Sequence, residues 1–284
     1  MNGNEEGHGD RGDRAEAEAL PTLGERRYSR ALGRGLEILS CFTAERPVLG
    51  TTEIAEMLGM SVGTTSRFMI TLADQGYLER DASRKYRLTL RATELGMGAL
   101  NEIGLCRHAR HYLQELARRS GYTVALGVLD GPEVLLVDLL PSARGSQSRD
   151  GGERGPGSSL PAYCTAIGKV LLANLGADRR SRLIAELAPG KHGPNTILTP
   201  QFLRAELGRV RDDGLAVNDE EAAAGTRAIA APVRDEAGDV VAAVGLATHD
   251  GAIELDDLVD RFTGRLITTA QRISARLGYL GVDE

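Results

Sequence analysis

The chain of 284 residues contains no tryptophan, and aromatic residues make up only 4% of it. Proteins that bind single-stranded nucleic acid stack the bases on aromatic side chains, so this scarcity argues against that class. No apolar run approaches the roughly 20 residues needed to cross a bilayer, and we therefore expect no membrane partner. The N-terminal segment is acidic and polar, so we expect no signal peptide.

The three cysteines, Cys41, Cys106 and Cys164, are an odd number without CxxC spacing. Such a set indicates neither a disulfide framework nor a zinc site, and it favours reduced thiols in a cytoplasmic protein. We expect no metal and no cofactor, since Walker and dinucleotide fingerprints are also missing. His108 and His111 are three apart on a predicted helix, but a solvated helix face is favoured over a metal site.

The net charge of −6 is unevenly distributed along the chain. Residues 1–24 carry six acidic and two basic side chains, whereas residues 25–91 carry eight acidic and eleven basic ones. An acidic chain is not expected to bind nucleic acid indiscriminately, but a basic segment attracts the phosphate backbone locally.

The first 24 residues are polar, with almost no large apolar group before Leu20. They bury too little surface to offset the entropy of ordering, which predicts a disordered tail. Between residues 28 and 44, apolar residues recur at spacings of three and four, which predicts an amphipathic helix. The stripe on this helix consists of Leu32, Leu36, Leu39 and Phe42.

Residues 48–91 have the layout of a winged helix-turn-helix. A short helix is expected to start near Thr51 and end at Gly59, and Ser61 is expected to cap a longer helix that ends at Gly76. Two strands around the turn DASRK then form a basic hairpin, the wing. The major groove is wide enough for one helix, so the longer helix is predicted to enter it. Its predicted inward residues are Thr65, Met69 and Leu72.

The outer face of the longer helix and the tip of the wing carry the expected DNA contacts. Arg67 can donate two hydrogen bonds to a guanine, with a solvated or structurally paired arginine as the alternative. Ser61 and Thr64, near a helix N-terminus, suit phosphate oxygens, and the wing tip is expected to meet the backbone or the minor groove. The predicted DNA-binding residues are Ser61, Val62, Gly63, Thr64, Ser66, Arg67, Arg84 and Lys85.

Beyond residue 91 the pattern alternates between helices and hairpins. Helical spacing runs over residues 92–117, and TVALGVLDGPEVLLVDLL predicts a hairpin. A glycine-rich stretch over residues 143–159 predicts a mobile loop, and further helices are expected from Thr165, over residues 201–214 and over 254–277. A second hairpin is expected around the turn EAGD. Helices flanking an antiparallel sheet predict an α+β domain.

The chain resembles the IclR-type bacterial transcriptional regulators over nearly all of its length after about residue 25. The resemblance depends on four blocks: RALGRGLEILSCF, EIAEMLGMSVGTTSRFMITLADQGYLERDASRKYRL, LPAYCTAIGKVLLA and GLAVNDEEAAAGTRAIAAPVRD. All four in this order and at these spacings are specific to that family. The start of the third block is most similar to the branch that regulates aromatic-acid catabolism.

The resemblance implies an α+β protein with a winged helix-turn-helix over residues 25–91, a linker helix over 92–112 and a GAF-like effector-binding domain over 113–284. It implies a homodimer, or a dimer of dimers, on palindromic double-stranded operator DNA. It also implies a regulator, repressor or activator, that responds to a small-molecule carboxylate effector and is not an enzyme.

The resemblance further places the effector at the start of the helix in the third block and along the strands of the fourth. That helix start presents N–H groups that can hold a carboxylate, although Thr165 is also explained as a simple helix cap. Tyr163 either lines the pocket or fills the core. Asn218 stands where the family prefers an acidic residue, and small residues nearby favour a larger, more apolar effector. The expected effector-binding residues are Tyr163, Thr165, Ala166, Ile167, Asn218, Ala228, Gly245 and Ala247.

Two other classes of function are alternatives. An enzyme would use Cys164 as a nucleophile or the acidic run Asp219, Glu220 and Glu221, although a buried small residue and a charged surface or helix start are simpler interpretations. A DNA-binding architectural protein would use its C-terminal domain only to oligomerise. Binding of an acid without turnover separates both alternatives from the regulator.

Overall fold

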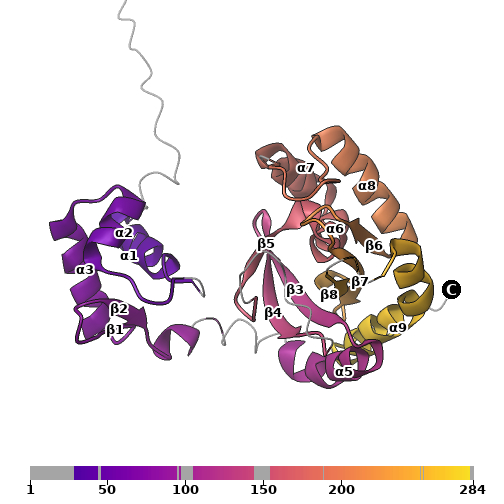
Figure 1. Cartoon of the computed structure of the whole chain (residues 1–284), viewed down its shortest axis with the longest axis horizontal. Helices are drawn as coiled ribbons and strands as arrows, with labels where there is room; N and C mark the ends of the chain where they lie inside the picture. The colour runs from indigo at the N-terminus through magenta and orange to yellow at the C-terminus, as the bar shows by residue number, and fades with distance from the viewer. Residues whose placement is uncertain are drawn as a thin grey trace, which may run out of the picture.

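The computed structural model describes residues 29–43, 46–94, 96, 105–143, 154–187, 189–249, 251 and 253–281. The tail expected over residues 1–24 lies outside this part, as do residues 97–104 of the expected linker helix and 144–153 of the glycine-rich stretch. The chain forms an N-terminal helical domain and a C-terminal α+β domain (Figure 1). Among the helices within these ranges, none is long and apolar enough to cross a membrane.

The N-terminal domain consists of three helices and a two-stranded antiparallel wing. Its elements are α1 (Arg30–Ser40), α2 (Thr51–Leu58), α3 (Val62–Asp74), β1 (Leu78–Arg80) and β2 (Tyr86–Leu88). Gly59 ends α2 with a left-handed φ of 61°, and Ser61 caps α3 by accepting a hydrogen bond from the Thr64 N–H. Gly76, with a φ of 78°, redirects the chain into the wing. The predicted winged helix-turn-helix is confirmed.

The apolar stripe predicted for α1 is only partly buried. Leu32 and Leu36 are 65% and 53% exposed, whereas Ile38 is fully buried among α2, α3 and the wing. Phe42 is buried as well, but it follows the end of the helix. The spacing predicted a helix correctly, but an apolar spacing does not reveal which side another element covers.

The C-terminal domain contains a six-stranded antiparallel sheet with the strand order β5-β4-β3-β8-β7-β6. The strands are β3 (Thr123–Asp130), β4 (Glu133–Leu140), β5 (Ser159–Pro161), β6 (Ala216–Asp219), β7 (Arg227–Arg234) and β8 (Val240–Thr248). Both predicted hairpins are present, β3-β4 and β7-β8, and β3 pairs with β8 to join them. The α+β prediction is confirmed.

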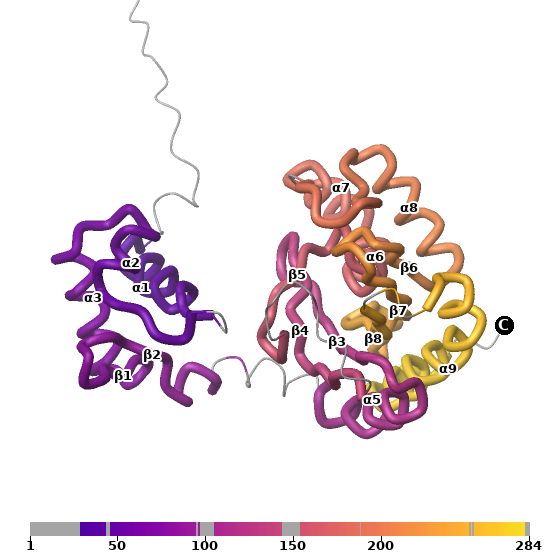
Figure 2. Tube along the Cα trace, viewed as in Figure 1, coloured from indigo at the N-terminus to yellow at the C-terminus, as the bar shows by residue number. Residues whose placement is uncertain are grey.

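Helices cover both faces of this sheet (Figure 2). Side chains alternate between the faces along each strand, so every long strand contributes to two separate cores. One core, with Val124, Ile229 and Val244, contains α5 (Leu105–Ser120) and α9 (Leu255–Arg276). The other core contains the 3-10 helix η2 (Ala162–Cys164), α6 (Ala166–Ala173), α7 (Ala177–Glu186) and α8 (Pro200–Asp213).

Helix α5 is part of the C-terminal core from its first turn. Leu105, Ala109 and Leu113 are fully buried in the core shared with α9. Residues 105–112, which the sequence analysis assigned to the linker helix, therefore pack inside the C-terminal domain. An apolar helix face has the same pattern whether it packs on its own sheet or on a partner chain, so the sequence did not separate the two.

Candidate functional site

Helix α3 presents its predicted contact residues on the exposed side of the N-terminal domain. Val62, Gly63 and Arg67 are exposed, whereas Thr65 and Met69 are fully buried and fix the rotation of the helix. An exposed arginine in the second turn of such a helix is long enough to reach base edges in a major groove.

The two hydroxyl groups at the start of α3 bond to each other. The Ser61 Oγ accepts from the Thr64 N–H at 3.2 Å and donates to the Thr64 Oγ1 at 2.9 Å. The Thr64 hydroxyl accepts in this pair, so its own proton is left to donate outward. Ser66 is half-buried on the same helix. The helix cap and the expected phosphate contact are therefore compatible at this position.

The wing tip holds its two predicted residues in different ways. Arg84 is exposed and lies in the left-handed region (φ 66°), where its N–H donates to the Asp81 carbonyl. Lys85 instead reaches back to the start of α2, where its Nζ lies 3.2 Å from the Glu53 carboxylate. The Gly50 N–H and Lys85 lower the pKa of Glu53. Lys85 is thus a paired residue at the edge of the candidate DNA interface.

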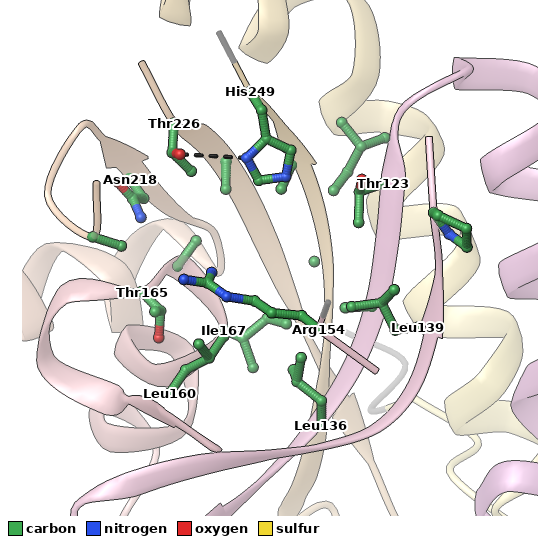
Figure 3. A pocket seen from close by; sticks show the side chains of 18 of the residues that line it. Thr123, Leu136, Leu139, Arg154, Leu160, Thr165, Ile167, Asn218, Thr226 and His249 are labelled. Atoms are coloured by element: carbon green, nitrogen blue, oxygen red, sulfur yellow. Dashed lines mark hydrogen bonds between the residues drawn. The ribbon is translucent and has the colours of Figure 1, made fainter. Parts of the chain in front are cut away.

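The C-terminal domain encloses a cavity of about 500 Å³ between the start of α6 and the sheet. A volume of this order is typical of small-molecule sites. Figure 3 shows side chains from strands, from α6 and from the segment before β5 around it. The lining residues are Thr123, Ala125, Leu136, Leu139, Pro141, Arg154, Gly155, Pro156, Leu160, Thr165, Ala166, Ile167, Asn218, Ala222, Thr226, Ala228, Gly245, Leu246, Ala247 and His249.

A row of small residues forms part of the cavity wall on the sheet. Across the strands, Asn218 pairs with Ala228, Ala228 with Ala247, and Ala247 with Thr123. In the next row Gly245 leaves room for Ile167, because a Cβ atom at Gly245 would lie 2.7 Å from the Ile167 Cγ1. The first turn of α6 therefore lies directly on the sheet, and small side chains keep the adjoining space open.

The start of α6 faces this cavity. Thr165 caps the helix, because its Oγ1 accepts from the Gly168 N–H at 3.2 Å. The helix's own hydrogen bonds begin with Lys169, whose N–H donates to the Thr165 carbonyl at 2.9 Å. Ala166 and Ile167 precede that bond and line the cavity. Thr165 therefore caps the helix and also lines the cavity, and its contact with an effector stays a prediction.

The side chains of Asn218 and Tyr163 form hydrogen bonds to backbone groups. The Asn218 side chain donates to the Cys164 carbonyl and accepts from the Glu221 N–H, although it also lines the cavity. Tyr163 is 5% exposed, its hydroxyl bonds both to the carbonyl and to the N–H of Gly190, and it is absent from the described cavity lining. Of the two alternatives for Tyr163, the structure favours the core residue, because its side chain is part of the buried core that contains α6.

Two strongly polar side chains of the cavity, Arg154 and His249, were not predicted from the sequence. Arg154 precedes a turn that was predicted as part of a mobile loop, but the Leu136 N–H donates to the Ser158 carbonyl and holds this turn against β4. His249 directly follows β8, and its Nδ1 lies 3.3 Å from the Thr226 Oγ1. Both residues lie outside the strands, in segments whose position depends on packing, so no local pattern indicated them.

A buried ion-pair cluster lies behind the cavity. Lys169 of α6 is fully buried, and its Nζ lies 2.6 Å from the Glu221 Oε1 and 3.0 Å from the Glu206 Oε1. Burial raises the pKa of Glu221, and the neighbouring Lys169 opposes that rise. The interpretation of Glu221 as part of a charged surface or helix start was wrong, because its carboxylate is needed to neutralise a buried lysine.

Cys164 lies in the core beside this cluster. Its side chain is fully buried, and burial raises the pKa of the thiol to about 12. The thiolate is the nucleophilic form, so this environment suppresses the reactivity of Cys164 near neutral pH. Among the residues that the structure describes, no three His, Cys, Asp or Glu side chains are grouped as for a metal ion.

Comparison with known proteins identifies relatives of both domains. The profile of the family described as bacterial transcriptional regulator IclR C-terminal matches residues 97–275, and that of the IclR helix-turn-helix domain matches residues 31–82. The HTH-type transcriptional regulator XynR of Escherichia coli (strain K12) is 31% identical over 253 residues, which cover 88% of this chain and 98% of XynR. The Pca regulon regulatory protein of Pseudomonas putida is 27% identical over 250 residues, covering 88% of this chain and 84% of that protein.

Solved structures share the architecture. The IclR of Thermotoga maritima is similar with a TM-score of 0.66 and 27% identity, covering 87% of this chain and 98% of that one. An IclR homologue from Microbacterium hydrocarbonoxydans, complexed with 4-hydroxybenzoate, is similar with a TM-score of 0.75 and 25% identity, covering 87% and 98%.

Proposed function

The chain belongs to the IclR family of bacterial transcriptional regulators, and we propose that its affinity for operator DNA is controlled by a small aromatic carboxylic acid bound in the C-terminal cavity. The observation that supports an effector is the cavity of about 500 Å³ at the start of α6, which is mostly apolar with a few polar side chains. Small-molecule sites have this combination, because apolar walls supply affinity and a few polar groups fix orientation.

Three features favour an aromatic acid over a short aliphatic one. The row from Asn218 to Thr123 contains two alanines, which leave a flat surface that suits a planar ring. Leu136, Leu139 and Leu160 supply apolar wall on other sides, and a two- or three-carbon acid would leave most of the volume unfilled. A relative of similar fold binds 4-hydroxybenzoate, and another is named for the Pca regulon.

We further propose that the protein acts in the cytoplasm as a homodimer or a dimer of dimers. Each winged helix would bind one half-site of a palindromic operator through the eight predicted residues of α3 and the wing, and dimer geometry would set the half-site spacing. An effector regulates only if the DNA-binding and the DNA-released arrangements bind it with different affinity. The proposal includes no catalytic step.

The decisive experiment measures operator binding by the purified full-length protein at fixed salt while acids are added. An operator duplex is first selected from a random library, and its affinity is followed by fluorescence anisotropy with benzoate, 4-hydroxybenzoate, pyruvate and glyoxylate. We expect an aromatic acid, and not the short acids, to change the affinity. Thermal unfolding is expected to show about 2.7 kcal/mol of added stability at 100 Kd of the active acid.

Two variants separate the two sites. Ala247→Phe fills the cavity and is expected to abolish the response to acid while DNA binding persists. Arg67→Ala is expected to weaken DNA binding while the acid still stabilises the protein. If no acid alters operator affinity or stability, the effector proposal is wrong, and a purely oligomerising C-terminal domain explains the result. Turnover of the acid would support the enzyme alternative.

A further inference from the structure

We infer that two apolar side chains of α3, Val62 and Ile70, read the methyl groups of two thymines, one on each side of the guanine expected at Arg67. The inference rests on the proposed function and deepens it, because it names bases that the operator half-site must contain and the side chains that recognise them. Ile70 is not among the DNA-binding residues predicted from the sequence, and the sequence assigned no base to Val62.

The buried side of α3 fixes which residues face outward. Thr65 is fully buried in the N-terminal domain. Each helical residue is rotated by about 100° from the one before it, so Gly63, Arg67 and Ile70 lie roughly opposite Thr65. Val62, the first residue of the helix, lies beside this outward side. Ile70 therefore follows Arg67 by one turn on the side that is predicted to enter the major groove.

Val62 and Ile70 are apolar side chains on this exposed part of the helix. They are 50% and 49% exposed, and neither belongs to the core of the N-terminal domain. β-Branched residues have a lower helix propensity than alanine, and a helix leaves them one strongly preferred rotamer. Each therefore presents a rigid apolar surface, at some cost to the helix, that the domain's own core does not use.

Gly63 lets the same side of the helix approach a partner closely. A Cβ atom at Gly63 would meet no atom within 4 Å, and the residue does not have a positive φ, so the described fold does not require a glycine there. A glycine inside a helix lowers stability relative to alanine, but its bare backbone permits close approach. The missing side chain thus allows Val62 and Arg67 to come nearer to the floor of a groove.

The length and charge of α3 limit the bases within reach. The axial rise from Val62 to Ile70 is about 12 Å, or about three to four base-pair steps of about 3.4 Å. Arg67 lies between them, about 7.5 Å and about 4.5 Å away along the axis, so each thymine should lie within about two base pairs of the guanine. Asp74 is exposed one turn beyond Ile70, and phosphates would repel its carboxylate. The DNA-facing part therefore ends near Ile70.

Thymine is the base that suits these two side chains. Its 5-methyl group is the apolar feature of the major groove, whereas the other base edges there present hydrogen-bond donors and acceptors. An apolar side chain placed against a donor or acceptor would remove it from water without replacing its hydrogen bond. Loss of one buried methyl group corresponds to roughly a three- to fivefold loss of affinity.

The test replaces single thymines in one half-site of the selected operator by uracil, which removes only the 5-methyl group. Anisotropy titrations at fixed salt compare the full-length wild type with Val62→Ala and Ile70→Ala, and thermal unfolding confirms that both variants fold. In the wild type, two of the replacements should each weaken binding roughly three- to fivefold. Val62→Ala should abolish the loss at one of these thymines and Ile70→Ala the loss at the other, because such a cycle isolates the pairwise contact.

Two controls accompany this cycle. Val48→Ala shortens another exposed valine of the same domain and should retain both losses. Replacing single guanines by 7-deazaguanine removes the N7 acceptor, so the guanine read by Arg67 is the one whose replacement no longer matters in Arg67→Ala. The two sensitive thymines should then lie on opposite sides of that guanine.

The outcomes separate the thymine assignment from the proposed function. The crossed pattern around the guanine supports the assignment. If the wild type binds a selected operator but no uracil replacement weakens it, if either alanine variant retains both losses, or if both thymines lie on one side of the guanine, the assignment is wrong and the proposed function stands. If no duplex is selected over random DNA, the proposed function fails and the assignment fails with it.

Discussion

Replacing Lys169 by methionine should destabilise the C-terminal domain far more than a surface lysine would. The Lys169 ammonium is fully buried between two carboxylates, and it is the group that neutralises Glu221, whose side chain is only 9% exposed. Breaking a buried pair by removing one partner typically costs about 3–5 kcal/mol, because the remaining charge is left without compensation. Glu206 is less affected, since Arg209 also lies 2.8 Å from its carboxylate.

The loss should depend on pH in a defined direction. Burial already raises the pKa of Glu221, and removal of Lys169 takes away the interaction that lowers it. A carboxyl whose pKa is higher in the folded than in the unfolded protein takes up a proton on folding, so stability falls as pH rises. The methionine variant is therefore expected to lose more stability at pH 8 than at pH 5.5, where Glu221 can become neutral.

Urea unfolding followed by circular dichroism at both pH values measures this effect. Lys191→Met removes an exposed lysine and is the matched control, with an expected change within about 0.5 kcal/mol. The double variant Lys169→Met with Glu221→Gln removes both charges and should recover part of the stability. A loss below about 1 kcal/mol at pH 8, or an equal loss at both pH values, would refute the reasoning.

Three further predictions follow from single contacts. Arg67→Ala should weaken binding to the selected operator by about 1–3 kcal/mol, and anisotropy titrations that show unchanged affinity would contradict a base contact. Iodoacetamide at pH 8 should leave Cys164 unmodified in the folded protein, because burial raises its pKa to about 12, whereas the half-buried Cys106 should react first in peptide mass spectra. Gly168→Ala would place a Cβ 2.2 Å from a backbone carbonyl oxygen of η2 and should cost about 3 kcal/mol or more in urea unfolding. Gly208→Ala meets no atom within 4 Å and should not destabilise; an equal loss for both would rule out the clash as the cause.

Local chemistry made the fold largely predictable. Capping by Ser61 and the left-handed Gly59 and Gly76 fixed the limits of α2 and α3, because each acts within a few residues. Both long hairpins were also predicted from turns. The apolar spacing did not predict which element each helix face packs against, because that depends on elements distant in sequence. The exposed Leu32 and the buried start of α5 are examples.

The candidate site could likewise be predicted only in part from the sequence. The family resemblance brought the start of α6 and the small residues of β7 and β8 to one cavity, but it did not indicate Arg154 or His249. The sequence around Lys169 contained a signal for a buried lysine, but no prediction was made from it. The run around it, AIGKVLLA, is apolar on every side, and such a helix is buried, so a lysine within it requires a buried acidic partner.

The buried charges near Asn218 favour a neutral side chain at that position. The Asn218 side chain donates to the Cys164 carbonyl and accepts from the Glu221 N–H, and an amide does both without carrying charge. An ionised aspartate there could not donate to the carbonyl, and it would add a further carboxylate beside Glu221 with Lys169 as the nearby buried cation. The amide thus adds no negative charge to the described lining of the cavity, so the sheet at this position does not repel an incoming carboxylate.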